Sequence, residues 1–189
     1  MADFSLRTMP PLGGYERDFN GTELRELVNL AIVVVSIPND EGAIFAQALL
    51  AGYGAEMPDH GNSVLAKEGK TRIIRFARDQ VMVLFDHETP DAPGVVSKAM
   101  NGVGYAVDQT HNWVTLALSG PLARAALERI CAVNLHKDAF ARNLAERTAL
   151  EKMGAIVIRT GEDEFLLMSG VSSAKSFLHA VETSINNVL

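Results

Sequence analysis

Apolar residues along the chain form short strand-like runs that alternate with helical stripes. In the first half, β-branched and aromatic residues predict four strands, at positions 30–37, 72–77, 80–85 and 105–109. Asn39 and Asp91 each precede a stretch whose apolar residues share one helical face, so a helix is predicted after each. The predicted order is strand, helix, strand, strand, helix, strand, with a tight hairpin at Arg78-Asp79 and a loop over residues 57–70.

The same order of elements begins again after residue 110. Ser119-Gly120-Pro121 follows a strand-like run and opens a helix, and a last helix follows Ser173. Ser36 and Ser119 each stand two residues before a proline and lie 83 residues apart, as do the hairpin turns at Arg78 and Gly161. This spacing favours a duplicated α/β unit. Coincidence is the alternative, because strand–proline–helix segments and hairpins are common.

Hairpins beside crossover helices predict an α+β fold made of two similar ferredoxin-like units with mixed or antiparallel sheets. We divide the chain into a first unit at residues 23–110 and a second at 111–189, packed closely enough to form one composite domain. Residues 1–22 contain Pro10-Pro11 and Gly13-Gly14 without a sustained period, which indicates an N-terminal arm that orders against a partner.

Charge narrows the classes of function. The 189 residues carry 17 Lys+Arg against 23 Asp+Glu, a net charge of −6, and the excess of acidic residues lies entirely before residue 111. No run of basic residues provides the footprint that a phosphate backbone or an anionic membrane needs. We therefore expect neither nucleic acid nor a membrane as a partner.

Three features predict a cytoplasmic protein. The single cysteine, Cys131, cannot form an intramolecular disulfide, and the first residues lack the basic and apolar regions of a secretory signal. The longest purely apolar run, residues 30–35, is far shorter than the roughly 20 residues that span a bilayer.

Candidate reaction centres each have a simpler structural interpretation. Asp86-His87-Glu88 lacks a second histidine one helical turn away and is typical of a solvated loop rather than a metal site. Cys131, five residues before His136, lies on a helical apolar stripe and is interpreted as a small core residue. Ser119 does not fit a nucleophile elbow and is expected to cap the following helix.

The remaining candidates are equally weak. Gly102-Val-Gly104 lies between a helix and a strand, the wrong place for a dinucleotide fingerprint. Trp113 is interpreted as a core or interface anchor, and the carboxylates at 162–164 as a solvated hairpin turn. We assign no catalytic, cofactor-binding or metal-binding residue. A folded, 48% apolar chain of this kind fits a subunit that contributes surface to an assembly, and a small-molecule binder that uses backbone and apolar groups is the alternative.

From Trp113 onward the chain resembles the gamma subunit family of heterotetrameric sarcosine oxidase. The resemblance rests on spaced landmarks over about 75 residues, which are Leu118-Ser-Gly-Pro121, Ala123-Arg124, Leu127, Cys131, Asn134-Leu-His136, Phe140, Arg147-Thr148, and the closing hairpin and helix from Asp163-Glu-Phe165 through Ser176-Phe177. Asn134 stands where the family typically has Asp, and Asn143 stands where it usually has Gly.

The resemblance implies a fold similar to the folate-binding domains of aminomethyltransferases. It also implies a non-catalytic gamma chain in a complex with alpha, beta and delta subunits, which demethylates sarcosine oxidatively to glycine in sarcosine catabolism. In such complexes FAD, FMN, NAD and zinc lie on the partner chains, hydrogen peroxide is formed, and tetrahydrofolate accepts the one-carbon unit. The alternative is a stand-alone folate-binding or one-carbon-transfer module, since a fold does not by itself determine a function.

Overall fold

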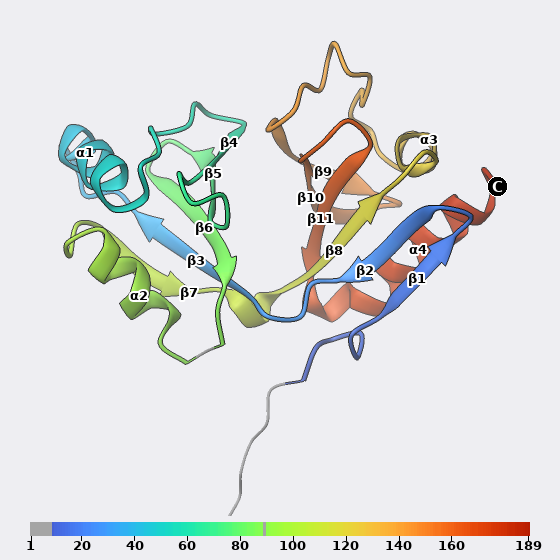
Figure 1. Ribbon diagram of the computed structural model, residues 1–189, viewed down its shortest axis with the longest axis horizontal. Helices are drawn as coiled ribbons and strands as arrows, with labels where there is room; N and C mark the ends of the chain where they lie inside the picture. The colour runs from blue at the N-terminus through green and yellow to red at the C-terminus, as the bar shows by residue number, and fades with distance from the viewer. Residues whose placement is uncertain (1–8, 89) are drawn as a thin grey trace, which may run out of the picture.

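The computed structural model describes residues 9–88 and 90–189. Two antiparallel sheets face each other, and the helices lie on their outer sides (Figure 1). The strands are β1 (Glu16–Phe19), β2 (Thr22–Glu26), β3 (Leu30–Ser36), β4 (Asn62–Leu65), β5 (Arg72–Ala77), β6 (Gln80–Asp86), β7 (Tyr105–Asp108), β8 (Trp113–Ser119), β9 (Ala145–Leu150), β10 (Met153–Arg159) and β11 (Glu164–Gly170). The α-helices are α1 (Gly42–Tyr53), α2 (Ala92–Ala99), α3 (Ala123–Glu128) and α4 (Ala174–Asn186).

The predicted α+β class is confirmed by the sheet topology. The five-stranded sheet has the order β4-β5-β6-β3-β7 with antiparallel neighbours, so β3, β5, β6 and β7 adopt the ferredoxin-like arrangement and β4 extends it. The six-stranded sheet has the order β1-β2-β8-β11-β10-β9, in which β8, β10 and β11 repeat the positions of β3, β5 and β6. Each strand of one unit thus has a counterpart in the other, except at one edge.

That edge is completed by the N-terminal part of the chain. In the first unit β7 pairs with β3, whereas in the second unit β2 pairs with β8 at the corresponding position. Residues 1–22 were predicted to form an arm, but the described part of that segment contains β1 and the first residue of β2. Residues 1–8 lie outside the described residues. Short polar strands such as Glu16–Phe19 lack the apolar run that identifies a strand in sequence.

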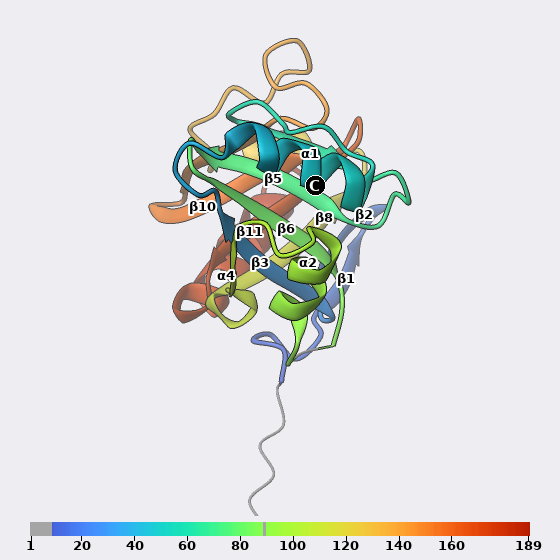
Figure 2. The same cartoon turned by 90° about the vertical axis from the view of Figure 1, so that its left-hand side faces the viewer.

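Three apolar cores hold the layers together. One lies between the five-stranded sheet and α1 and α2, which cover its outer face (Figure 2), and a second lies between the six-stranded sheet and α3 and α4. The third lies between the two sheets and includes Ile32, Met82, Ile156 and Met168. Both faces of the central strands are therefore buried, which explains why β3 and β10 have continuous apolar runs instead of alternation.

The sheets also meet edge to edge at a corner between β4 and β9. Ser63 N–H donates to the carbonyl of Asn143 (2.8 Å), and Ala145 N–H donates to the carbonyl of Gly61 (2.9 Å). Strand β4 lies inside the segment 57–70 that was predicted as a loop, and its pairing with β5 and with this corner accounts for the difference. Its four residues are too short and too polar to produce a clear strand pattern.

Helix α2 begins at Ala92 directly after Asp91, as predicted, but the start of α1 differs from the prediction. Helix α1 begins at Gly42 after Glu41, without a side-chain cap, so the predicted role of Asn39 is wrong. Gly54 ends that helix in the left-handed conformation (φ 61°), where glycine is the least strained residue. No helix among the described residues is both long and apolar enough to cross a membrane.

Candidate functional site

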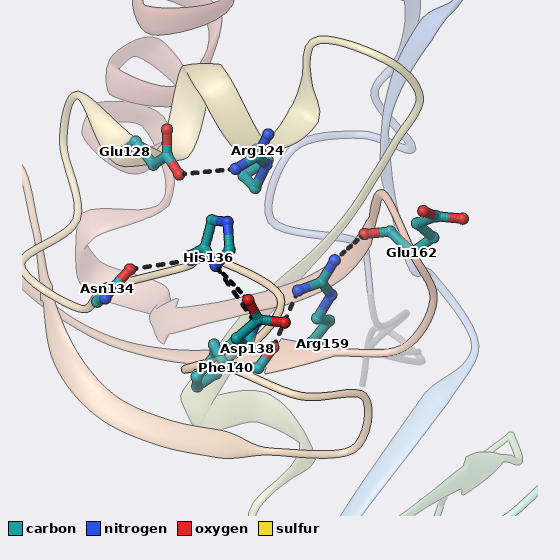
Figure 3. A network of polar contacts seen from close by, with 8 residues as sticks. All are labelled: Arg124, Glu128, Asn134, His136, Asp138, Phe140, Arg159 and Glu162. Atoms are coloured by element: carbon teal, nitrogen blue, oxygen red, sulfur yellow. Dashed lines mark hydrogen bonds and ion pairs between the residues drawn. The ribbon is translucent and has the colours of Figure 1, made fainter.

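The family landmarks between α3 and β9 form a loop that is stabilised by hydrogen bonds between its own residues. His136 N–H donates to Asn134 Oδ1 (3.0 Å), and Phe140 N–H donates to the carbonyl of His136 (2.8 Å) (Figure 3). Leu135 and Phe140 are buried in the core of the six-stranded sheet, whereas the His136 side chain is exposed and lies 3.4 Å from Asp138 Oδ2. The buried side chains of Leu135 and Phe140 therefore anchor this loop, and the imidazole of His136 lies in solvent.

Arg159 holds this loop to the β10–β11 hairpin. Its side chain is buried, and its three nitrogens donate to backbone carbonyls. Nη1 donates to Phe140 (3.0 Å) and Nη2 to Glu162 (Figure 3), and Nε donates to Gly161 (3.0 Å). Its guanidinium also lies over the ring of Phe165. Sequence reasoning missed Arg159, although a charged residue that ends an apolar strand run is a recognisable signal.

Cys131 packs against the core as predicted, but it does not lie on a helix, because α3 ends at Glu128. It packs partly buried against the core of the six-stranded sheet, and its backbone bridges to Leu150. Burial raises the pKa of the Cys131 thiol, which disfavours the thiolate that nucleophilic catalysis requires. The structure does not join Cys131 and His136 by a hydrogen bond or ion pair within the described residues.

The Ser119-Gly120-Pro121 landmark is a contact point for the N-terminal hairpin. Gly120 has φ 115°, and a Cβ built there would lie 2.3 Å from the carbonyl oxygen of Gly21. Leu122 N–H, at the start of α3, donates to Thr22 Oγ1 (3.1 Å), and α3 has no cap from a neighbouring side chain. The predicted capping role of Ser119 is therefore wrong, because a threonine about 100 residues away fulfils it.

Two carboxylates hold the N-terminal segment against the six-stranded sheet and α4. Glu26, only 5% exposed, accepts the backbone N–H groups of Leu12 (2.9 Å) and Gly14 (2.8 Å). On α4, Glu182 accepts the Tyr15 hydroxyl (2.6 Å). These charge-assisted bonds are stronger than neutral ones, and they order a segment whose composition indicated only turns.

Two tyrosines with raised pKa values make the folded chain less stable at alkaline pH. Burial, together with the hydrogen bond to Glu182, raises the pKa of Tyr15 to about 12, and burial raises the pKa of Tyr53 to about 12. An unfolded tyrosine ionises near pH 10, so between about pH 10 and 12 the unfolded chain binds fewer protons and the free energy of unfolding falls as pH rises. Denaturant unfolding at about pH 9 and 11 should show this fall, and Tyr15→Phe should reduce it. An equal fall in both proteins would contradict the role of Tyr15.

A second buried arginine lies at the corner between β4 and β9. Arg72 is 7% exposed, and its Nη1 donates to Ser63 Oγ (2.7 Å) and Asn143 Oδ1 (3.1 Å). Asn143 has φ 72°, a left-handed conformation that explains why glycine is usual at this position in the family. Sequence reasoning missed Arg72, since only the tertiary structure brings β5 against the start of β9.

The structure does not bring the other candidate residues from the sequence together in one site. His87 Nε2 lies 2.7 Å from Asp91 Oδ1, and this pairing lowers the pKa of the Asp91 carboxyl. Trp113 packs against the core between the sheets and also lines a cleft of about 530 Å³ beside His87 and His111. Among residues 9–88 and 90–189, no group of three or more His, Cys, Asp or Glu side chains is placed to hold a metal ion.

The fold places this chain in a structural class that includes two proteins of known structure. The aminomethyltransferase T of the glycine cleavage system from Bartonella henselae superposes with a TM-score of 0.64 at 14% identity, over 92% of this chain and 56% of that one. A chain of the heterotetrameric sarcosine oxidase from Corynebacterium sp. U-96, solved with pyrrole 2-carboxylate, superposes with a TM-score of 0.75 at 23% identity, over 88% of this chain and 84% of that one. The chain therefore has the α+β fold shared by these two proteins.

Sequence similarity singles out one kind of subunit within that class. The sarcosine oxidase gamma subunit of Corynebacterium sp. (strain P-1) is 28% identical over 158 residues, covering 83% of this chain and 76% of the relative. That of an Arthrobacter species is 27% identical over 157 residues, with 82% and 76% covered. No family model matches the chain. The resemblance to the sarcosine oxidase gamma subunits is confirmed, and it extends well beyond the 75 residues that carried it in the sequence analysis.

Proposed function

We propose that this chain is the gamma-type subunit of a heterotetrameric, flavin-dependent sarcosine oxidase and acts in it as a non-catalytic structural subunit. The observation that carries the proposal is the similarity to named gamma subunits over 83% of the chain. The complex would oxidise sarcosine to glycine, form hydrogen peroxide and pass the one-carbon unit to tetrahydrofolate. The flavins, NAD and zinc would lie on the alpha, beta and delta chains.

The roles of the landmark residues support a scaffold function. Phe140 anchors a loop in the core, and the lack of a side chain at Gly120 allows the N-terminal hairpin to approach closely. Cys131 packs against the core, and burial raises the pKa of its thiol. These residues stabilise the position of surfaces rather than present reactive groups to a substrate.

A strand edge that has no pairing partner among the described residues supports assembly with other chains. Strand β7 ends the five-stranded sheet, and its Tyr105 and Val107 side chains are 69% and 51% exposed. An exposed sheet edge with apolar side chains is typical of a surface that another chain covers.

Co-expression with the other three subunits of a sarcosine oxidase tests the proposal. The chain should co-elute with them in size-exclusion chromatography and should be required for a stable complex of full size. Elution of this chain apart from an intact complex of the other three would contradict it.

A titration with tetrahydrofolate separates this function from the stand-alone module. The isolated chain should show no saturable binding, measured by calorimetry. Saturable binding without partners would favour a folate-binding or one-carbon-transfer protein instead.

A further inference from the structure

Arg72 is a buried cation with an incomplete set of partners. Its Nη1 donates to a hydroxyl and an amide oxygen, but within the described residues Nε and Nη2 make no hydrogen bond. The ion pairs of the described residues involve other cations, namely Arg17, His87, Arg124 and His136. A guanidinium that is 7% exposed thus has no carboxylate from the described part of its own chain.

Arg159, by contrast, is a buried arginine whose three side-chain nitrogens all have hydrogen-bond partners. Its exposure is 4%, and each of its three nitrogens donates to a carbonyl. Removing a charge from water is unfavourable unless hydrogen bonds and opposite charge replace the solvent. Arg159 has that replacement within the chain, whereas Nε and Nη2 of Arg72 have no partner among the described residues and keep contact with solvent, where a group from another chain can reach them.

Burial and a second positive charge at the corner make an anion beside Arg72 electrostatically favourable. Burial lowers the pKa of the Arg72 guanidinium, and the positive charge of the exposed Arg142 lowers it further. The Nε of Arg142 donates to the carbonyl of Thr160 (2.8 Å), which holds this second cation beside the corner. Arg142 directly precedes Asn143, whose side chain accepts from Arg72 Nη1, so both cations belong to the same corner of a chain whose net charge is −6.

The groups that surround Arg72 are held in place by bonds across the corner. The Asn143 carbonyl accepts both the N–H and the hydroxyl of Ser63, and Asn143 N–H donates to the carbonyl of Arg159 (2.8 Å). The orientation of the Arg72 guanidinium is thus set by both sheets before any partner arrives. Preorganisation of this kind favours binding because little side-chain freedom is lost.

We propose that the corner between β4 and β9, through Arg72 and Arg142, is the docking site for a carboxylate on an acidic segment of a partner subunit. A planar guanidinium with two neighbouring free N–H groups matches the two oxygens of a carboxylate, and the charge of Arg142 attracts an acidic surface. The inference rests on the proposed function, because it locates on this chain one contact with the other subunits.

Affinity measurements on the reconstituted complex test the inference. The other three subunits are immobilised, and dissociation constants are compared for wild type, Arg72→Met, Arg142→Glu and the control Arg124→Gln. Arg124 is a surface arginine that already has a carboxylate partner, Glu128, 3.4 Å away. Arg72→Met and Arg142→Glu should each weaken binding by about tenfold or more, with a reduced dependence on salt, whereas the control should bind like wild type.

Thermal unfolding of the isolated chain separates loss of docking from loss of fold. Arg142→Glu places a carboxylate beside Arg72, so its melting temperature should equal or exceed that of wild type while the affinity for the partners falls. Unchanged affinity of both variants, in a complex that wild type forms, overturns the inference and leaves the proposed function intact.

Two further outcomes are also decisive. Failure of wild type to bind the other subunits at all overturns the proposed function and, with it, the docking site. A free anion is the occupant, and the inference is wrong, if the variants bind partners normally while sodium sulfate stabilises isolated wild type more than Arg72→Met at equal ionic strength.

Discussion

Replacing Arg159 by leucine should lower the free energy of unfolding by about 3 kcal/mol or more. The substitution removes three charge-assisted hydrogen bonds and leaves the carbonyl of buried Phe140 without its donor. The loop that contains His136 and the β10–β11 hairpin would lose their common attachment. Urea unfolding followed by circular dichroism measures the change.

Two companion variants make the result specific to the geometry of Arg159. Arg159→Lys keeps the charge but cannot reach three carbonyls at once, so its loss should be intermediate. Arg124→Gln removes an exposed arginine paired with Glu128 and should change stability by only about 0.5 kcal/mol or less. A loss in Arg159→Leu no larger than in Arg124→Gln would contradict the role assigned to the buried guanidinium.

Replacing Gly120 by alanine should destabilise the chain by about 2–4 kcal/mol. The residue has φ 115°, and the new Cβ would lie 2.3 Å from the Gly21 oxygen and 2.8 Å from the Thr22 Cα. Both neighbours are backbone atoms of the β1–β2 turn, so the hairpin itself has to shift. The hydrogen bond from Leu122 N–H to Thr22 Oγ1 would weaken with it.

Gly154 provides the matched control for this substitution. It lies in β10 without a positive φ, and a Cβ added there meets no atom within 4 Å. Gly154→Ala should therefore be neutral or slightly stabilising, because alanine restricts the unfolded chain. Equal stability of the two alanine variants would show that the hairpin does not depend on close approach at Gly120. Hydrogen exchange of the β1 and β2 amides identifies where the Gly120 variant loosens.

Much of the candidate site could not be predicted from sequence. The landmark residues themselves were recognisable, and Cys131 was placed in a packed position by the apolar stripe around it. Arg72 carries no local pattern, since its partner Asn143 lies 71 residues away. The apolar run before Arg159 marks that residue, but it does not show the bond to Phe140, 19 residues away. Hydrogen-bond partners at such separations depend on how sheets are arranged, which periodicity does not encode.

The capping predictions fail for a related reason. Ser119 and Asn39 have suitable side chains before a helix, but neither cap forms. Thr22 supplies the acceptor at the start of α3 because the N-terminal hairpin packs against that turn. A local rule names the residue type that satisfies an N–H group, whereas the fold decides which residue of that type is within reach.

By itself the sequence determined the α+β class, the family resemblance and the order of strand, helix, hairpin and helix that the two units share. These follow from local information, since apolar runs, helical stripes and turn residues act over a few neighbouring positions. Only the tertiary structure decided that β2 completes the six-stranded sheet and that β4 and β9 join the two sheets at a corner. It also decided that Arg72 is buried at that corner and that Arg159 is buried beneath the loop that contains His136. Those features depend on contacts between residues distant in sequence, whose free energy becomes available only when both sheets have formed.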